Sequence, residues 1–532
     1  MTGEWDYIVV GAGSAGCVLA NRLSADPGNK VLLLEAGPRD RNLWLHIPVG
    51  YYKTMLSPLS WGYDTEPEPA LGNRRIHWPR GKVLGGSSAI NGLVYVRGQP
   101  EDYDHWRQLG NLGWGWDDVR PYFLKSEDQE RGAGEFHGVG GPLRVSDIRD
   151  RRKICDAFVA AAQEVGIPYN HDFNGPTQEG VGYFQTTSRD GLRCSSAGAY
   201  LKPVRNRANL KVETGALATA LTFDGKRATG VRYLQDGREA TATARGEIVL
   251  SGGAVNSPQL LQLSGVGPGA VLRPLEIEVR HDLGGVGRDL QDHLQARSIY
   301  RLNRPMSVND DVNNVLRRMW IGIDYALRRR GPLTFSAGHA CLFAKVLPES
   351  ATPDLQFHFI PFSADKPGTG LHPWPGVTAS VCQLRPESRG EITLRSTDPR
   401  EHPKIVANYL STEYDRRVLI EGLRLARRIS QAPSFAKYVD REVEPGPDRL
   451  DDEALLEHIR ERGSTIFHPT STCRMGQDDG AVVDERLRVR GLHGLRVADC
   501  SIMPTVVSGN TNAPAIMIGE KCADMMLMDA KA

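Results

Sequence analysis

The sequence lacks both a long apolar run and an excess of either charge. No stretch reaches the roughly 18 uninterrupted apolar residues that a membrane-spanning helix needs. Lys and Arg number 65 against 64 Asp and Glu, which gives a formal net charge of +1. Nucleic-acid binding usually needs a strongly basic face, so nucleic acid is not an expected partner. The start of the chain carries Glu4 and Asp6 and no apolar segment, so no secretory signal peptide is predicted.

Cysteine is also sparse, with eight residues scattered along the chain. No two of them form a Cys-x-x-Cys pair, so zinc ribbons, thioredoxin-like redox pairs and c-type haem attachment are not expected, and no metal site is predicted. Scattered cysteines in a large chain are typical of small buried side chains in a reducing compartment. We therefore expect a cytoplasmic enzyme, with peripheral attachment to the inner face of the membrane as an open alternative.

The remaining composition is that of an ordinary soluble globular protein. The chain has 532 residues, of which 40% are hydrophobic and 24% charged. This excludes a collagen, a disordered chain and a small disulfide scaffold. At roughly 100–200 residues per domain, the length predicts two or more domains.

The first chemical signal is a glycine-rich turn near the start of the chain. Residues 7–10 form an apolar run suited to a buried strand, and Gly11, Gly13 and Gly16 follow in a Gly-x-Gly-x-x-Gly pattern that opens a helical segment. A second apolar run then ends in Glu35, where a carboxylate can accept hydrogen bonds from ribose hydroxyls. Strand, glycine turn, helix, strand and acid together predict a dinucleotide site, with the phosphates at the helix N-terminus.

This pattern does not decide which dinucleotide binds. NAD and FAD both use it, whereas the acid disfavours the 2′-phosphate of NADP. Three further glycine-rich blocks, at 79–98, 252–267 and 494–514, have the composition of loops that run beside an extended ligand. Because they are spread over the whole chain, they predict a discontinuous nucleotide domain.

Taken together, these blocks resemble the glucose–methanol–choline family of flavin-dependent oxidoreductases. The resemblance rests on the fingerprint and on GKVLGGSSAINGLVYVRG, GAVNSPQLLQLSGVG, PESRG, IFHPTSTCRMG and VADCSIMPTVVSGNTNAPAIMIGEK. Within the family the likeness is to the bacterial choline-dehydrogenase-like and aliphatic alcohol dehydrogenase branch. It implies FAD as cofactor and an α/β fold, in which a discontinuous Rossmann-like FAD-binding domain joins an α+β substrate domain built on an antiparallel sheet.

The resemblance also implies the division of the chain. The expected FAD-binding domain comprises 1–155, 203–295 and 465–532, and the expected substrate-binding domain comprises 156–202 and 296–464. Some relatives attach the flavin covalently to a histidine before the Asn of the GGSS segment. Here Ile90 precedes Asn91, so we expect the FAD to be held non-covalently. The implied cofactor-binding residues are Gly11, Gly13, Ser14, Gly16, Glu35, Ala36, Lys82, Leu84, Gly85, Ser88, Asn91, Gly92, Ala218, Asp499, Asn512 and Ala513.

Oxidation of an alcohol by a flavin needs a base for the hydroxyl proton and a group that holds the substrate oxygen. Histidine suits the first role, and Asn or His suits the second. Among fourteen histidines, His468 matches the family's active-site motif, and Asn510 matches the position of its partner. We therefore expect His468 to act as base and Asn510 as anchor, while hydride passes to flavin N5. Pro514 stands in the first turn of a predicted helix, whose positive end is expected to stabilise the reduced ring.

The resemblance thus predicts an FAD-dependent dehydrogenase that oxidises a primary alcohol to an aldehyde and passes electrons to a quinone or another carrier. One alternative is an oxidase that uses oxygen and releases peroxide. Another is non-redox chemistry, since the family includes a hydroxynitrile lyase and a fatty-acid decarboxylase. The sequence leaves the oligomeric state open.

The substrate pocket has weaker signals. Residues 355–361 alternate like a strand of the substrate domain, so His358 and Phe359 are pocket candidates, with a core-facing position as the alternative. No cluster of aromatic and acidic residues indicates a cage for a quaternary ammonium group, so an aliphatic or arylalkyl primary alcohol is preferred. Residues 315–330 are apolar in the middle and basic towards both ends. This pattern fits either a helix on an anionic membrane or one packed on the domain with solvated arginines.

Overall fold

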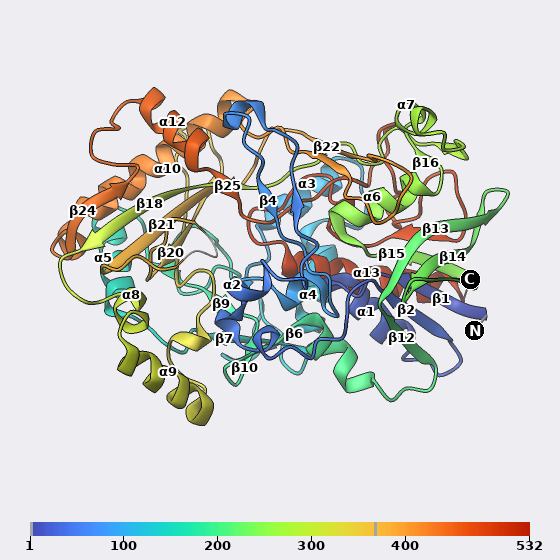
Figure 1. Cartoon of the computed structure of the whole chain (residues 1–532), viewed down its shortest axis with the longest axis horizontal. Helices are drawn as coiled ribbons and strands as arrows, with labels where there is room; N and C mark the ends of the chain where they lie inside the picture. The colour runs from blue at the N-terminus through green and yellow to red at the C-terminus, as the bar shows by residue number, and fades with distance from the viewer. Residues whose placement is uncertain (1–3, 367–369, 532) are drawn as a thin grey trace.

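The computed structural model describes residues 4–366 and 370–531. Within these residues the chain forms two seven-stranded sheets, which lie at opposite ends of the long axis of the molecule and carry their own helices (Figure 1). One sheet has a parallel core and the other is antiparallel. This arrangement confirms the predicted fold class.

The first sheet takes its strands from the beginning, the middle and the end of the chain. The pairs β12–β2, β2–β1, β1–β15 and β15–β26 are parallel, and β13, β14 and β15 are joined as antiparallel neighbours. The apolar run at 31–35 is buried along its whole length, as a strand covered on both faces requires. In order across the sheet the strands are β12 (Leu210–Thr214), β2 (Val31–Glu35), β1 (Glu4–Val10), β15 (Arg238–Leu250), β14 (Arg227–Gln235) and β13 (Ala216–Asp224), and β26 (Leu495–Val497) pairs with β15.

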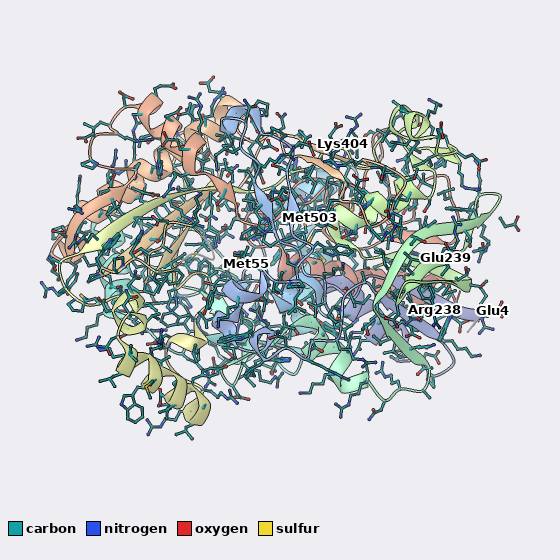
Figure 2. The ribbon with its side chains drawn as sticks, viewed as in Figure 1. Glu4, Met55, Arg238, Glu239, Lys404 and Met503 are labelled. Atoms are coloured by element: carbon teal, nitrogen blue, oxygen red, sulfur yellow. The ribbon has the colours of Figure 1, made fainter. Side chains whose placement is uncertain are left out.

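Figure 2 shows how far this sheet reaches from the centre of the molecule. Glu4, at the start of β1, and Arg238 and Glu239, at the start of β15, lie at its outer end, whereas Met55 and Met503 lie near the middle. The carboxyl ends of the parallel strands therefore point inward, towards the second sheet. In open α/β sheets this is the edge at which ligands bind.

The second sheet is antiparallel throughout, and helices cover one of its faces. On β20, Leu355, Phe357 and Phe359 pack into the apolar core with the helices, whereas His358 and Ile360 face the other way. The covering helices are α5 (Lys153–Glu164), α10 (Glu413–Gln431), α11 (Pro433–Ala436) and α12 (Asp452–Arg462). The strands in order are β24 (Val439–Glu444), β18 (Leu294–Leu302), β21 (Gly376–Gln383), β20 (Leu355–Ile360), β19 (Ala340–Ala344) and β8 (Gly180–Tyr183), and β25 (Ser464–Thr465) pairs with β18.

Two segments pack differently from the predicted division of the chain. Tyr63 and Trp78 belong to the core of the second sheet, although 1–155 was expected in the FAD-binding domain. The helical turn Ala197–Leu201 belongs to the core of the first sheet, although 156–202 was expected in the substrate-binding domain. Both segments therefore pack against the sheet of the other predicted domain. Their position in the sequence does not decide which core they join.

The remaining elements include α1 (Ser14–Leu23) and α13 (Asn512–Asp529), which pack together in the core of the first sheet, and shorter helices and strands. The remaining helices are α2 (Tyr51–Thr54), α3 (Pro100–Gln108), α4 (Trp116–Ser126), α6 (Gly253–Leu263), α7 (Gly269–Leu272), α8 (Val308–Val312) and α9 (Val315–Arg328). The remaining strands are β3 (Tyr63–Asp64), β4 (His77–Trp78), β5 (Val94–Tyr95), β6 (Glu127–Gln129), β7 (Leu143–Asp147), β9 (Gln185–Thr186), β10 (Ser188–Arg189), β11 (Leu192–Arg193), β16 (Val266–Gly267), β17 (His281–Asp282), β22 (Glu391–Thr393) and β23 (Lys404–Val406). No helix in the described part of the chain is long and apolar enough to cross a membrane.

A buried ion pair joins the two ends of the chain across the first domain. Arg22 of α1 donates two hydrogen bonds to Glu520 of α13, at 2.7 and 2.8 Å, and the Glu520 side chain has no solvent exposure. Tyr200 also donates to this carboxylate at 3.0 Å, and the exposed Lys125 approaches it within 3.3 Å. Removing a buried carboxylate that serves several donors leaves them unpaired.

We expect Glu520→Leu to destabilise the protein by about 3 kcal/mol, because it leaves Arg22 and Tyr200 without their acceptor. Lys125→Met is the matched control, since it removes only the exposed cation and should cost less than about 1 kcal/mol. Thermal denaturation of both variants measures the difference. Equal melting temperatures for the two variants would show that the Arg22–Glu520 ion pair does not stabilise the fold.

Candidate active site

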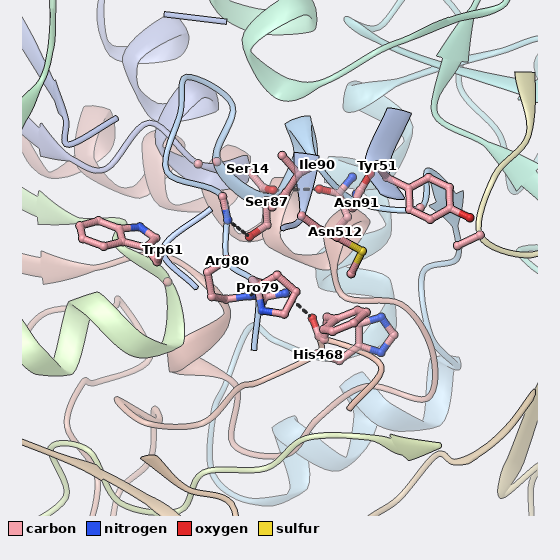
Figure 3. A pocket seen from close by; sticks show the side chains of 18 of the residues that line it. Ser14, Tyr51, Trp61, Pro79, Arg80, Ser87, Ile90, Asn91, His468 and Asn512 are labelled. Atoms are coloured by element: carbon pink, nitrogen blue, oxygen red, sulfur yellow. Dashed lines mark hydrogen bonds between the residues drawn. The ribbon is translucent and has the colours of Figure 1, made fainter. Parts of the chain in front are cut away.

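A cavity of about 860 Å³ lies between the two sheets and is lined by residues from both. Figure 3 shows one part of it, where Ser14, Ser87, Asn91, His468 and Asn512 converge from distant parts of the sequence. Met55, near the middle of the molecule in Figure 2, also lines this space. The cavity therefore lies at the inward edge of the parallel sheet.

The glycine turn after β1 forms one wall, and Glu35 holds its backbone. The Glu35 carboxylate accepts hydrogen bonds from the N–H of Ala12 at 2.9 Å and of Gly37 at 2.8 Å. Burial raises the pKa of Glu35 to about 7, and these two hydrogen bonds oppose the rise. The acid at the end of β2 thus orders the turn itself, in addition to facing the cavity.

Two glycine-rich loops meet at a contact that has no room for a side chain. A Cβ on Gly86 would lie 2.6 Å from the Cα of Gly13, and Gly86 has φ +52°. The N–H of Gly85 also donates to the carbonyl of Ala12 at 2.8 Å. The second glycine-rich segment is therefore fixed against the first.

The last part of the chain completes this half of the cavity. Asn512, at the start of α13, accepts a hydrogen bond from the Ser14 hydroxyl at 2.8 Å (Figure 3). Asp499 accepts hydrogen bonds from Gly253 N–H at 2.8 Å and from the Ser257 hydroxyl at 2.6 Å. Backbone donors, a helix N-terminus and a carboxylate fit the dinucleotide that the sequence predicts.

Most of the predicted cofactor residues lie on the cavity wall, and some lie behind it. Gly16 packs against the Gly11 carbonyl, the Lys82 amine lies over the Trp61 ring, and Leu84 is in the core. The Ser88 hydroxyl donates a hydrogen bond to the Gly85 carbonyl and accepts one from the Ser196 N–H. The predicted residues on the wall are Gly11, Gly13, Ser14, Glu35, Ala36, Asn91, Gly92, Ala218, Asp499 and Asn512, and those behind it are Gly16, Lys82, Leu84, Gly85, Ser88 and Ala513.

The segment that carries His468 has an unusual backbone held by several hydrogen bonds. Phe467 has φ +71°, a conformation that is costly for a residue with a side chain. Its carbonyl accepts a hydrogen bond from Arg80 at 2.8 Å (Figure 3), and its N–H donates to Thr465. The N–H of His468 donates to the buried carboxylate of Asp292 at 2.7 Å.

The His468 ring lies between two polar partners. Its Nε2 is 3.1 Å from the Asn510 amide nitrogen, and its Nδ1 is 3.0 Å from Nδ1 of His293. Burial lowers the pKa of His468 well below its usual range, and His293 and His358 lower it further. The ring is therefore neutral at pH 7 and able to accept a proton, and the predicted pair of His468 and Asn510 is in hydrogen-bond contact.

The strand prediction for 355–361 is correct, but only one of its two pocket candidates faces the cavity. His358 lines the cavity, and burial lowers the pKa of its ring to about 3. Phe359 does not line it, because neighbouring side chains of a strand point to opposite faces. Its ring stacks on Phe158 with centroids 4.2 Å apart, so the assignment of Phe359 to the pocket is corrected to the core.

Several residues around His468 were not predicted from the sequence. Asp292, His293, Arg80 and Gln356 all contact the His468 segment or its partner Asn510. In the sequence, Asp292 and His293 stand out only as an acid next to a histidine, and such pairs are common. Their role becomes visible only in the fold, where His293 contacts His468 across 175 residues of sequence.

Comparisons with known proteins agree over nearly the whole chain. Two family models described as GMC oxidoreductase match residues 5–295 and 386–519. An alcohol dehydrogenase [acceptor] of Pseudomonas putida is 46% identical and covers 98% of this chain and 96% of its own. An oxygen-dependent choline dehydrogenase of Burkholderia lata is 43% identical, with 98% and 93% covered. Among solved structures, an Aspergillus oryzae formate oxidase studied for FAD modification has TM-score 0.92 and 27% identity, with 100% and 99% covered.

We expect Gly86→Ala to lower the flavin content of the purified protein and to weaken flavin binding to the apoprotein at least about tenfold, because its methyl group must displace Gly13. Gly72→Ala is the matched control. Gly72 has a similar φ of +65° but open space around a Cβ, so this variant should keep its flavin. Flavin absorbance per chain measures both, and equal retention would refute the role of the contact.

Proposed function

Because the chain belongs to the GMC oxidoreductase family, we propose that it is an FAD-dependent dehydrogenase that oxidises an uncharged primary alcohol to an aldehyde. Electrons then pass to a quinone or another carrier. The observation that carries this proposal is the contact between a neutral, buried His468 and the Asn510 amide in a cavity that fits a dinucleotide.

Each protein group has a definite task in this reaction. Bound FAD supplies a two-electron acceptor for the hydride of the alcohol carbon. The Asn510 amide donates a hydrogen bond to the substrate oxygen and holds it in place, while His468 Nε2 takes the hydroxyl proton. The O–H bond breaks, an N–H bond forms on His468, and the carbon becomes a carbonyl. Burial keeps His468 neutral, so the base is ready at pH 7 without prior loss of a proton.

The charges around the cavity favour an uncharged substrate over choline. Glu35 and Asp499 are the carboxylates that line it among the described residues, and both belong to the dinucleotide half. The wall near β18 instead carries Arg297, and α9 adds Arg318. A quaternary ammonium group would meet cations and no carboxylate there. The apolar side chains of that half, including Val308, Val312, Ile321, Leu333, Phe335 and Ile360, suit an aliphatic or arylalkyl chain.

Non-covalent binding of the FAD is part of this proposal. Ile90 and Asn91 line the cavity at the position where some relatives carry the linking histidine. The side-chain oxygen of Asn91 accepts hydrogen bonds from Arg193 at 2.7 Å and from Leu93 N–H at 3.1 Å, which fixes the orientation of this side chain. Backbone contacts and hydrogen bonds then hold the cofactor without a bond to the chain.

We expect His468→Ala to slow anaerobic bleaching of the flavin by a primary alcohol by about 10²- to 10⁴-fold, the range of a lost general base, with flavin content unchanged. His458→Ala is the control, since His458 is another buried histidine that bonds a backbone carbonyl on β18 and does not line the cavity. Stopped-flow absorbance over a panel of alcohols measures the rate.

The same panel separates the alternatives. Rapid peroxide formation without an added acceptor would favour an oxidase. Absence of bleaching by any alcohol in the unmodified enzyme would overturn the proposed oxidation and favour a lyase or decarboxylase.

We also propose that α9 attaches the enzyme to an anionic membrane surface. Six of the fifteen large apolar side chains exposed in the described residues lie on this one helix, with exposed fractions between 46% and 78%. The segment 315–330 also carries five arginines and one aspartate. Figure 1 shows α9 projecting from the body of the molecule near the second sheet. An exposed apolar face flanked by arginines is the pattern of a helix that lies in a lipid interface.

The side of α9 that faces the protein lies next to the cavity. Tyr325 is buried and donates a hydrogen bond to the Gly191 carbonyl at 3.0 Å, and Ile321 and Gly322 line the cavity. The helix thus lies at the cavity wall with its apolar side turned away from the protein. A quinone or a long-chain alcohol dissolved in the bilayer would then be close to the site.

We expect the double variant Leu316→Ser, Trp320→Ser to bind vesicles of phosphatidylglycerol and phosphatidylcholine at least about tenfold more weakly than the unmodified protein, because each side chain contributes roughly 1.5–3 kcal/mol when buried. Leu112→Ser with Leu450→Ser is the control, since both leucines are equally exposed elsewhere. Vesicle sedimentation measures binding. Equal binding by both double variants would contradict a role for α9.

A further inference from the structure

His293 is buried beside His468, and its two ring nitrogens have different partners. Nε2 lies 3.0 Å from the carbonyl oxygen of Leu384, and Nδ1 lies 3.0 Å from Nδ1 of His468. The proposed reaction uses His468 and Asn510 and assigns no task to His293. Its side chain has no solvent exposure, so both contacts are made away from water.

A carbonyl oxygen can only accept a hydrogen bond, so Nε2 of His293 must carry the proton. Burial lowers the pKa of His293 to about 4, which leaves the ring neutral at pH 7. A neutral ring with a proton on Nε2 has a lone pair on Nδ1. The hydrogen of the His293–His468 contact therefore belongs to Nδ1 of His468, and Nε2 of His468 keeps its lone pair.

The other side of His468 agrees with this assignment. Gln356 donates from its amide nitrogen to Oδ1 of Asn510 at 3.2 Å, which turns the Asn510 amide nitrogen towards His468. Cys382 in turn donates to the amide oxygen of Gln356 at 3.8 Å. Every donor in this series points the same way, from Cys382 through Gln356, Asn510, His468 and His293 to the Leu384 carbonyl.

From this series we propose that His293 is a positioning residue that fixes the tautomer of His468, so that the lone pair of Nε2 faces the cavity. The inference rests on the proposed role of His468 as base. A substrate hydroxyl fits into the series without reversing it, because its oxygen accepts from Asn510 and its hydrogen is donated to Nε2 of His468.

The Leu384 carbonyl at the end of the series also determines how the substrate proton leaves His468. The Leu384 carbonyl accepts a hydrogen bond but takes up no proton at neutral pH, so His293 cannot pass a proton onward. The proton that His468 takes from the substrate must leave through Nε2, by way of the cavity. His293 therefore orients the base and stabilises the charged ring through one hydrogen bond, as the third member of a catalytic triad does.

The direct test is the tautomer of His468 in the resting holoenzyme. In protein labelled with ¹⁵N-histidine, long-range proton–nitrogen correlation spectra distinguish a proton on Nδ1 from one on Nε2. The signals are assigned by their loss in His468→Gln and in His293→Asn. We expect His468 to carry its proton on Nδ1 and His293 to carry its proton on Nε2. A proton on Nε2 of His468 would overturn the proposal, whether or not the enzyme oxidises alcohols.

Two variants separate positioning from packing. Asn in place of His293 offers an oxygen near the position of Nδ1, so His293→Asn should keep the His468 tautomer and kcat/KM within about threefold. His293→Leu offers no acceptor, so we expect the fixed tautomer to be lost and kcat/KM to fall about 10- to 100-fold, mainly through kcat.

His458→Leu is the matched control, because it removes another buried histidine that bonds a backbone carbonyl and has no contact with His468. It should leave the His468 tautomer and kcat/KM unchanged. Equal losses in His293→Leu and His458→Leu, or a Leu variant that keeps the proton on Nδ1 of His468, would show that His293 acts only through packing.

Discussion

The hydrogen bonds that Asp292 and His293 accept from His468 are the constraint on which the site depends. The two residues stand directly before β18, the strand that brings the second sheet to the cavity, and His468 lies in the segment that returns the chain to the first sheet. Because Phe467 and Ser471 both adopt positive φ, this segment needs such partners to keep its shape. One pair of neighbouring residues therefore fixes both the backbone and the ring of the proposed base.

The cavity has two halves of different chemical character, and the fold explains both. The glycine turn and the N-terminus of α1, at the ends of the parallel strands, line the half that suits a charged, extended ligand. The antiparallel sheet supplies one face of alternating side chains, which can be apolar because the helices cover only its other face. His468 lies where these halves meet, and the low polarity of its surroundings keeps its ring neutral.

Local patterns predicted the elements that local forces control. The apolar runs at 7–10 and 31–34 and the glycine turn between them are where the sequence placed them, and the last helix, expected from Ala515 onward, begins at Asn512. Alternation also predicted the strand at 355–361, which is found at 355–360. An alternating pattern does not say which face meets the core, and Phe359, a pocket candidate with a core-facing alternative, lies in the core. Tyr63, Trp78 and the turn at 197–201 pack on the opposite core from the one expected, because segments that cross between domains follow packing.

The sequence by itself determined that this chain builds a dinucleotide site from separate glycine-rich blocks, and it predicted His468 as base and Asn510 as anchor through the motifs around them. Those features depend on residue types a few positions apart, so they can be recognised within one short segment of the sequence. Only the tertiary structure brought His293 and Gln356 to the two sides of that pair. Hydrogen-bond direction is a property of atoms in contact, so the donor series through His468 exists only after distant segments have packed together.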